Sequence, residues 1–194
     1  PGFYTGTKIV SLSVTPSNSL TIYYTTDGSE PTTGSNVYVS TPISTSTTTV
    51  IRAYAVSSNA SILPSFMETN TYFINETIDS HYGVVSISGG APLNQLLGGT
   101  QNVPSTHLEY YEGQAFKTEG YGSANKHGND SWAYSQRGID VETFDEYGYN
   151  NAYKHQFFTD PNMNDVSPRA EFQHVILKAA ASDNYSADNN TGKL

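Results

Sequence analysis

The clearest structural pattern lies in Ser131-Trp-Ala-Tyr-Ser-Gln-Arg-Gly-Ile-Asp-Val-Glu-Thr-Phe-Asp-Glu-Tyr-Gly-Tyr-Asn-Asn-Ala-Tyr-Lys-His-Gln-Phe-Phe158, which holds the single tryptophan and seven further aromatic residues. Within it, residues 138–144 alternate between apolar positions, such as Ile139 and Val141, and polar ones. An alternation with period two predicts a β-strand with one buried face.

The second half of this stretch predicts a turn and a returning segment. Residues 145–148 form the turn, because Gly148 can adopt a positive φ, and the aromatic run at residues 153–158 can return beside the first strand. The stretch therefore predicts a long hairpin with an aromatic face. That face is expected to be a packing or subunit interface, with sugar stacking as the alternative. Its members are Trp132, Tyr134, Tyr147, Tyr149 and Tyr153.

Composition limits the partners of the chain. It has 194 residues, no cysteine and a formal net charge of -9. Disulfides, thiolate metal sites and thiol catalysis are therefore excluded. Acidity without a Lys/Arg cluster argues against nucleic acid and anionic membrane surfaces. No apolar run is long enough for membrane insertion. Abundant Ser, Thr, Asn, Gly and Tyr with sparse charge favour an extracellular or cell-surface location.

Residues 1–76 contain short alternating segments separated by turns. Strands are expected at residues 8–15, 20–25, 37–39, 48–56 and 69–74. Several short strands with turn signals between them predict an immunoglobulin-like β-sandwich.

One series of motifs in this first module is more specific. It consists of Ile22-Tyr-Tyr-Thr-Thr-Asp-Gly-Ser-Glu-Pro-Thr32, then Val37-Tyr38, Pro42-Ile43 and Thr48-Thr-Val-Ile-Arg-Ala-Tyr-Ala55. The series resembles the small immunoglobulin-like domain at the C-terminus of chitobiases and hexosaminidases, also called the fibronectin-III-associated type. The resemblance implies an accessory spacer without catalytic residues. Asp27 is expected to cap the turn that follows it.

Residues 77–82 are polar and aperiodic, and we expect them to link to a second β-rich module, residues 83–194, with little helix. Strands are expected at residues 84–88 and in a hairpin around Glu112-Gly113. Residues 120–128 predict a glycine-rich loop. Residues 171–178 predict a buried strand, and the C-terminal end predicts a polar tail.

The second module also has a family resemblance. Its motifs are Val84-Val-Ser-Ile-Ser88, His107-Leu-Glu-Tyr-Tyr-Glu-Gly113, His127-Gly-Asn-Asp-Ser131 and Gln136-Arg-Gly-Ile-Asp-Val141, followed by Phe157-Phe158 and the apolar segment at residues 172–177. Their order resembles the N-terminal β-rich part of the CotH-like spore-coat kinase domain. The ATP- and metal-binding residues of that family would lie beyond this chain, so none is assigned here.

One loop has the spacing of a calcium site. Asp160, Asn162, Asn164 and Glu171 occupy positions 1, 3, 5 and 12 of the calcium-loop template. Position 6 is Asp165 instead of the required glycine. An ordinary Asx-rich loop is therefore favoured, with calcium as the alternative, and no other cofactor is expected.

These observations favour a non-enzymatic extracellular structural or adhesive protein that associates with itself or with other surface proteins, for example in a filament. Two alternatives remain. The chain could be a fragment of a secreted CotH-type protein kinase that lacks its catalytic half. It could also be an accessory carbohydrate-binding module of a glycoside hydrolase, with glycans as its partners.

Overall fold

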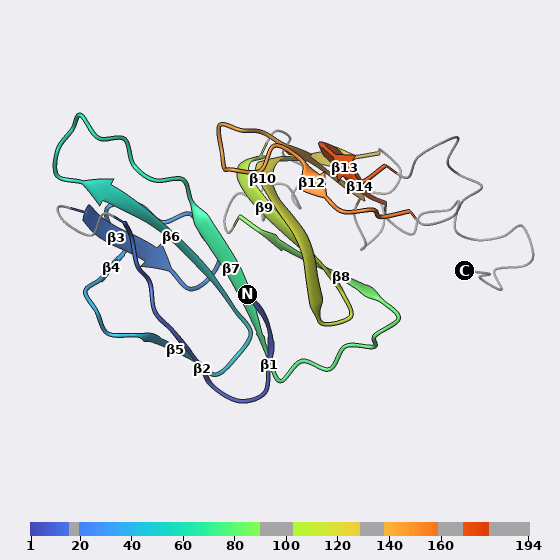
Figure 1. The fold of residues 1–194 in the computed structure, drawn as a ribbon, viewed down its shortest axis with the longest axis horizontal. Helices are drawn as coiled ribbons and strands as arrows, with labels where there is room; N and C mark the ends of the chain where they lie inside the picture. The colour runs from blue at the N-terminus through green and yellow to red at the C-terminus, as the bar shows by residue number, and fades with distance from the viewer. Residues whose placement is uncertain (16–19, 90–102, 129–137, 159–168, 179–194) are drawn as a thin grey trace, which may run out of the picture.

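The computed structural model describes residues 1–15, 20–89, 103–128, 138–158 and 169–178. These residues form strands and turns only, which confirms the all-β fold class. In this described part, the strands make two five-stranded sheets and two two-stranded ribbons (Figure 1). It has no helix that could cross a membrane.

The first sheet has the strand order β1-β7-β6-β3-β4. Only β1 runs parallel to its neighbour, and the other pairs are antiparallel. A separate antiparallel ribbon joins β2 to β5. The strands are β1 (Gly2–Tyr4), β2 (Lys8–Val10), β3 (Leu20–Thr25), β4 (Asn36–Tyr38), β5 (Ile43–Thr45), β6 (Thr49–Ser57) and β7 (Glu68–Ile74).

The core of the first module follows from the alternation along β6. Ile51, Ala53 and Ala55 point to one face of the sheet and are buried. Val10 of β2 is also buried and lines the same cavity as Ala53 and Ala55, so the ribbon covers this face. A sheet covered by a ribbon over an apolar core agrees with the predicted β-sandwich.

The second sheet is antiparallel throughout, with the order β14-β11-β10-β9-β8. A further antiparallel ribbon pairs β12 with β13. The strands are β8 (Gly83–Ser88), β9 (Val103–Glu112), β10 (Ala115–His127), β11 (Gly138–Thr143), β12 (Tyr153–Lys154), β13 (Glu171–Phe172) and β14 (His174–Leu177). Its apolar face is built on Val103, Leu108, Ala124, Val141 and Tyr153.

The predicted long hairpin at residues 131–158 is wrong. The strand within it exists as β11, but its two neighbours are β10 and β14. Both edges of β11 are therefore occupied, and no edge is left for the aromatic run. Tyr153 instead pairs with Phe172 in the ribbon of β12 and β13.

Two further predictions need correction. Residues 120–127 are not a loop, because they continue β10, which pairs with both β9 and β11. Residues 171–177 do form strands, as predicted, but these are the short β13 and β14, with side chains that alternate between half-buried and exposed. The predicted polar tail lies outside the described residues.

Candidate functional site

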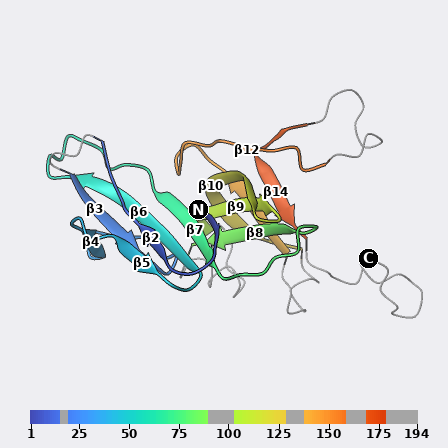
Figure 2. The same cartoon turned by 60° about the horizontal axis from the view of Figure 1, so that its bottom comes forward.

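The two five-stranded sheets meet through side chains that are mostly polar. Figures 1 and 2 place β7 of the first sheet beside β8 and β9 of the second. We call this contact the polar seam. The first sheet contributes Arg52, Thr69 and Thr71, and the second contributes His107, Glu109 and Tyr121. All six are less than 5% exposed.

Glu109 lies at the centre of this seam and is fully buried. One carboxylate oxygen accepts hydrogen bonds from the backbone N–H of Thr71, at 3.2 Å, and from the hydroxyl of Tyr111, at 3.0 Å. The other oxygen accepts a hydrogen bond from the Thr71 hydroxyl. Burial and the neighbouring Glu109 both raise the pKa of Tyr111, so this phenol remains a donor at neutral pH.

Arg52 of the first sheet makes a second connection between the two sheets. Its side chain is fully buried, and Nη2 donates to the carbonyl oxygen of Ser105 at 2.8 Å. Nη1 donates to the carbonyl oxygen of Gly28 at 3.4 Å. Burial lowers the pKa of this guanidinium, while the charge of Glu30 opposes that shift. The guanidinium therefore links a turn of the first module to β9 of the second.

The rings of His107 and Tyr121 are in contact at the same seam, tilted by 31° with centroids 4.2 Å apart. The Tyr121 hydroxyl accepts a hydrogen bond from the backbone N–H of Thr69 at 2.7 Å, while burial raises its pKa. His107 Nε2 lies 3.3 Å from a carboxylate oxygen of Glu119, which is ion-pair distance without hydrogen-bond geometry.

Several buried atoms near the seam have no protein hydrogen-bond partner: Arg52 Nε, Thr69 Oγ1, Ser88 Oγ and His107 Nδ1. Buried polar atoms of this kind are ordinarily hydrated in proteins. Among the described residues, no group of three or more His, Cys, Asp or Glu side chains could hold a metal ion. The seam is thus a buried polar contact between the two sheets, with hydrogen bonds across it.

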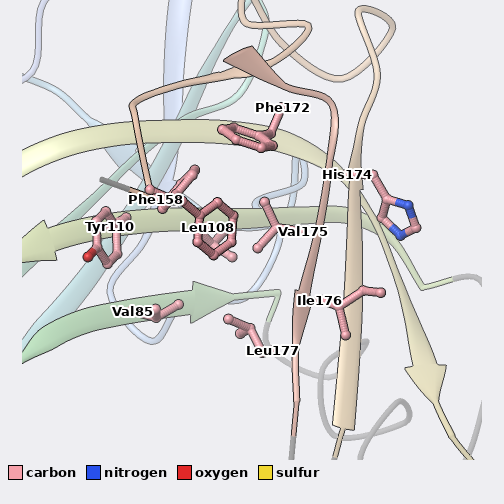
Figure 3. A pocket seen from close by; sticks show the side chains of 10 residues that line it. Val85, Leu108, Tyr110, Phe158, Phe172, His174, Val175, Ile176 and Leu177 are labelled. Carbon is pink, nitrogen blue, oxygen red and sulfur yellow. The ribbon is translucent and has the colours of Figure 1, made fainter. Parts of the chain in front are cut away.

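The opposite face of the second sheet holds an apolar pocket of about 450 Å³. Figure 3 shows side chains from β8, β9, β13 and β14 converging on it, with Leu108 and Val175 near its centre. Phe158 and Ile176 are about half exposed at this surface. Tyr110 and His174 are the polar members of its lining, which otherwise consists of Val85, Leu108, Phe157, Phe158, Phe172, Val175, Ile176 and Leu177.

The structure separates the predicted aromatic face. Trp132 and Tyr134 lie outside the described residues. Tyr153 is fully buried in the core, whereas Tyr149 is 77% exposed. Tyr147 packs edge-on against Phe144. The three described members therefore do not form one platform.

Three of the four predicted calcium ligands, Asp160, Asn162 and Asn164, lie outside the described residues. The fourth, Glu171, is exposed in β13. The turn at Asp27 is as predicted, since Asp27 Oδ1 accepts hydrogen bonds from the backbone N–H and the hydroxyl of Ser29. These bonds lower the pKa of Asp27.

Sequence reasoning missed the seam residues Arg52, His107 and Glu109. A signal was present, because each interrupts a strand segment rich in β-branched or aromatic residues. Charged or polar residues in such a segment ordinarily face water, and here they face the other sheet. The partner strands that cover them are distant in sequence, which is why the signal could not be interpreted.

Comparison with known proteins supports the first resemblance. The model of the chitobiase/beta-hexosaminidase C-terminal domain matches residues 1–62, which include β1 to β6. No curated protein and no solved structure matches the chain. The similarity therefore covers about a third of the chain, and the CotH-like resemblance of the second module stays a prediction.

Proposed function

We propose that this chain is a non-catalytic extracellular structural unit, in which the two sheets act together as one rigid spacer. The observation that carries the proposal is the polar seam. Arg52 and Glu109 are fully buried, and each makes at least one hydrogen bond to the opposite sheet. A buried polar group that loses its partner is costly, so the seam opposes separation of the sheets.

The matched domain type supports the extracellular part of the proposal, because it belongs to carbohydrate-active enzymes that work outside the cell. The sheets also have strand edges available for association. Among the described residues, β4 pairs only with β3, and β8 pairs only with β9. Open edges of this kind can accept a strand from another molecule. Self-association into a filament or other surface assembly is therefore part of the proposal.

Rigidity can be tested with spin labels, because the chain has no cysteine and introduced thiols are unique. Nitroxides are attached at Ser58→Cys in the first module and Gln114→Cys in the second, both at exposed positions. Electron–electron resonance then gives the distance distribution between the labels. We expect a width equal to that of a control pair within the first module, Ser58→Cys with Thr33→Cys. A much broader distribution for the first pair would exclude a rigid spacer.

A second candidate function is favoured by the apolar pocket of the second sheet. Its exposed Phe158 and Ile176 surround a concave surface of a kind that commonly packs against further protein. This surface fits the alternative that the chain leads into the catalytic half of a CotH-type kinase. A longer natural chain with metal-binding carboxylates downstream and ATP-dependent phosphotransfer would support this candidate.

The self-association proposed above has its own test. Light scattering that finds a monomer at high concentration would count against a filament or other assembly.

A further inference from the structure

The cavity that Val10, Ala53 and Ala55 line in the first module has a volume of about 480 Å³, and it extends along β7 to one loop of the second module. We call it the groove. Its wall from β7 carries Glu68, Asn70 and Tyr72, which alternate along the strand and therefore share a face. Phe66 precedes that strand, and Tyr149 comes from the loop after β11. The volume is within the usual range of small-ligand sites.

The aromatic part of this groove is a pair of rings from different modules. Phe66 and Tyr149 meet edge to face, with centroids 4.8 Å apart. Phe66 is 38% exposed and Tyr149 is 77% exposed. An edge-to-face contact holds the rings in place while leaving part of each ring surface accessible. Such a surface suits the C–H face of a ring-shaped ligand.

The polar part of the groove supplies both donors and acceptors. Asn70 Nδ2 donates to a carboxylate oxygen of Glu68 at 3.0 Å, which orients both side chains. The second Glu68 oxygen and the Asn70 carbonyl oxygen can still accept hydrogen bonds. Ser11 and Ser13, which are exposed residues, also belong to the lining. Burial raises the pKa of Tyr72, so its hydroxyl remains available as a donor.

The charge of the groove limits the ligand further. Its described lining contains Glu68 and no Lys or Arg, in a chain of net charge -9. Anionic ligands are therefore disfavoured. An apolar peptide would offer no donor to the second Glu68 oxygen or to the Asn70 carbonyl oxygen, and unpaired polar groups at an interface cost affinity. A sugar ring offers an apolar face together with hydroxyls that both donate and accept, and it matches this lining.

We propose that this groove binds a neutral glycan chain, which stacks the face of one sugar ring on Tyr149, beside Phe66, and hydrogen-bonds through its hydroxyls to Glu68 and Asn70. The inference deepens the proposed function, because a glycan site would make the rigid unit a targeting module. It rests on that function only in assuming an extracellular setting. The spin-label experiment tests rigidity and the titration tests glycan binding. Either result can be negative while the other is positive, so the failure of one proposal is distinguishable from the failure of the other.

The test is a calorimetric and NMR titration of the full chain with three soluble probes: chitohexaose, cellohexaose and the anionic hexagalacturonate. We expect saturable binding of at least one neutral hexamer and weaker binding of the anionic one. Tyr149→Ala should weaken binding about tenfold, because a stacked ring contact is lost. Asn70→Ala should also weaken it, through a lost hydrogen bond.

The matched control is Tyr82→Ala, which removes an aromatic side chain of similar exposure, 68%, away from the groove. It should leave the affinity for the neutral hexamer unchanged. Circular dichroism checks that each variant is folded. Three outcomes would overturn the proposal: no binding of either neutral hexamer at millimolar concentration, preference for the anionic hexamer, or equal effects of Tyr149→Ala and Tyr82→Ala.

Discussion

At the scale of single residues, Glu109 shows how a buried carboxylate can be kept without a basic partner. Its oxygens accept from a backbone N–H and two hydroxyls, and all these donors lie in the seam or beside it. Hydrogen bonds to a charged acceptor are stronger than neutral ones. The side chain thus links β9 to Thr71 of β7 through hydrogen bonds. A neutral side chain at this position could accept only some of them.

Two substitutions of Glu109 separate the roles of hydrogen bonding and packing. Glu109→Leu leaves the Thr71 N–H and the Tyr111 hydroxyl without an acceptor, so we expect a loss of about 3 kcal/mol in unfolding free energy. Glu109→Gln keeps one acceptor oxygen, and we expect a loss of about 1 kcal/mol. Urea unfolding at pH 7 measures both. Equal losses in the two variants would contradict the hydrogen-bonding argument, because they would mean that the acceptor oxygen kept by Glu109→Gln does not stabilise the seam.

Individual side chains were the hardest level to predict from sequence. The cap at Asp27 was predictable, because it involves Ser29, two residues away. The partners of Glu109 and Arg52 were not, since Thr71 is 38 residues from Glu109 and Ser105 is 53 residues from Arg52. A local pattern has no information on which distant strand will cover a polar residue.

At the scale of elements, β10 is the strand that organises the second sheet. It pairs with β9 along one edge and with β11 along the other. Its glycines led to the prediction of a loop, but they are needed for close packing. A Cβ built on Gly122 would lie on the backbone carbonyl of Glu142, 2.6 Å from its carbon and 2.8 Å from Thr143 Cα.

Gly122→Ala should therefore destabilise the protein by about 3 kcal/mol, because backbone atoms of β11 cannot move aside without breaking the pairing. The control is Gly34→Ala, where the nearest atom to the new Cβ would be Thr32 Oγ1 at 3.6 Å, an ordinary contact. That variant should change stability by less than about 0.5 kcal/mol. Thermal unfolding measures both, and similar melting temperatures for the two would contradict the packing argument.

Strand positions were largely predictable, and strand pairing was not. Period-two patterns located β3, β6, β8 and β11 to within about one residue. The hairpin of β9 and β10 followed from its turn signal. The neighbours of β11 did not follow, because β14 lies about thirty residues further along the chain and has only four residues. Long-range pairing depends on edges that other strands leave available.

At the scale of the whole molecule, the first sheet packs on a different partner at each of its two faces. One face of the first sheet packs on its own ribbon, and the other packs on the polar seam. Aromatic side chains close one side of the seam, where Phe3 and Phe73 stack and both meet Tyr111 edge to face. The contact thus combines hydrogen bonds at its centre with apolar packing beside them, as protein interfaces commonly do.

Arg52→Met tests whether the seam makes the modules unfold together. The variant keeps an unbranched side chain but removes the donors to Ser105 O and Gly28 O, so coupling between the sheets should weaken by about 2 kcal/mol. Urea unfolding is followed by the fluorescence of a dye, attached at Gln114→Cys in the second module or, in a separate sample, at Ser58→Cys in the first. We expect coincident transitions in the parent chain and separate ones in the variant. Arg169→Met, at an exposed arginine, should leave them coincident. Coincident transitions in Arg52→Met would mean that the aromatic contacts alone couple the two sheets.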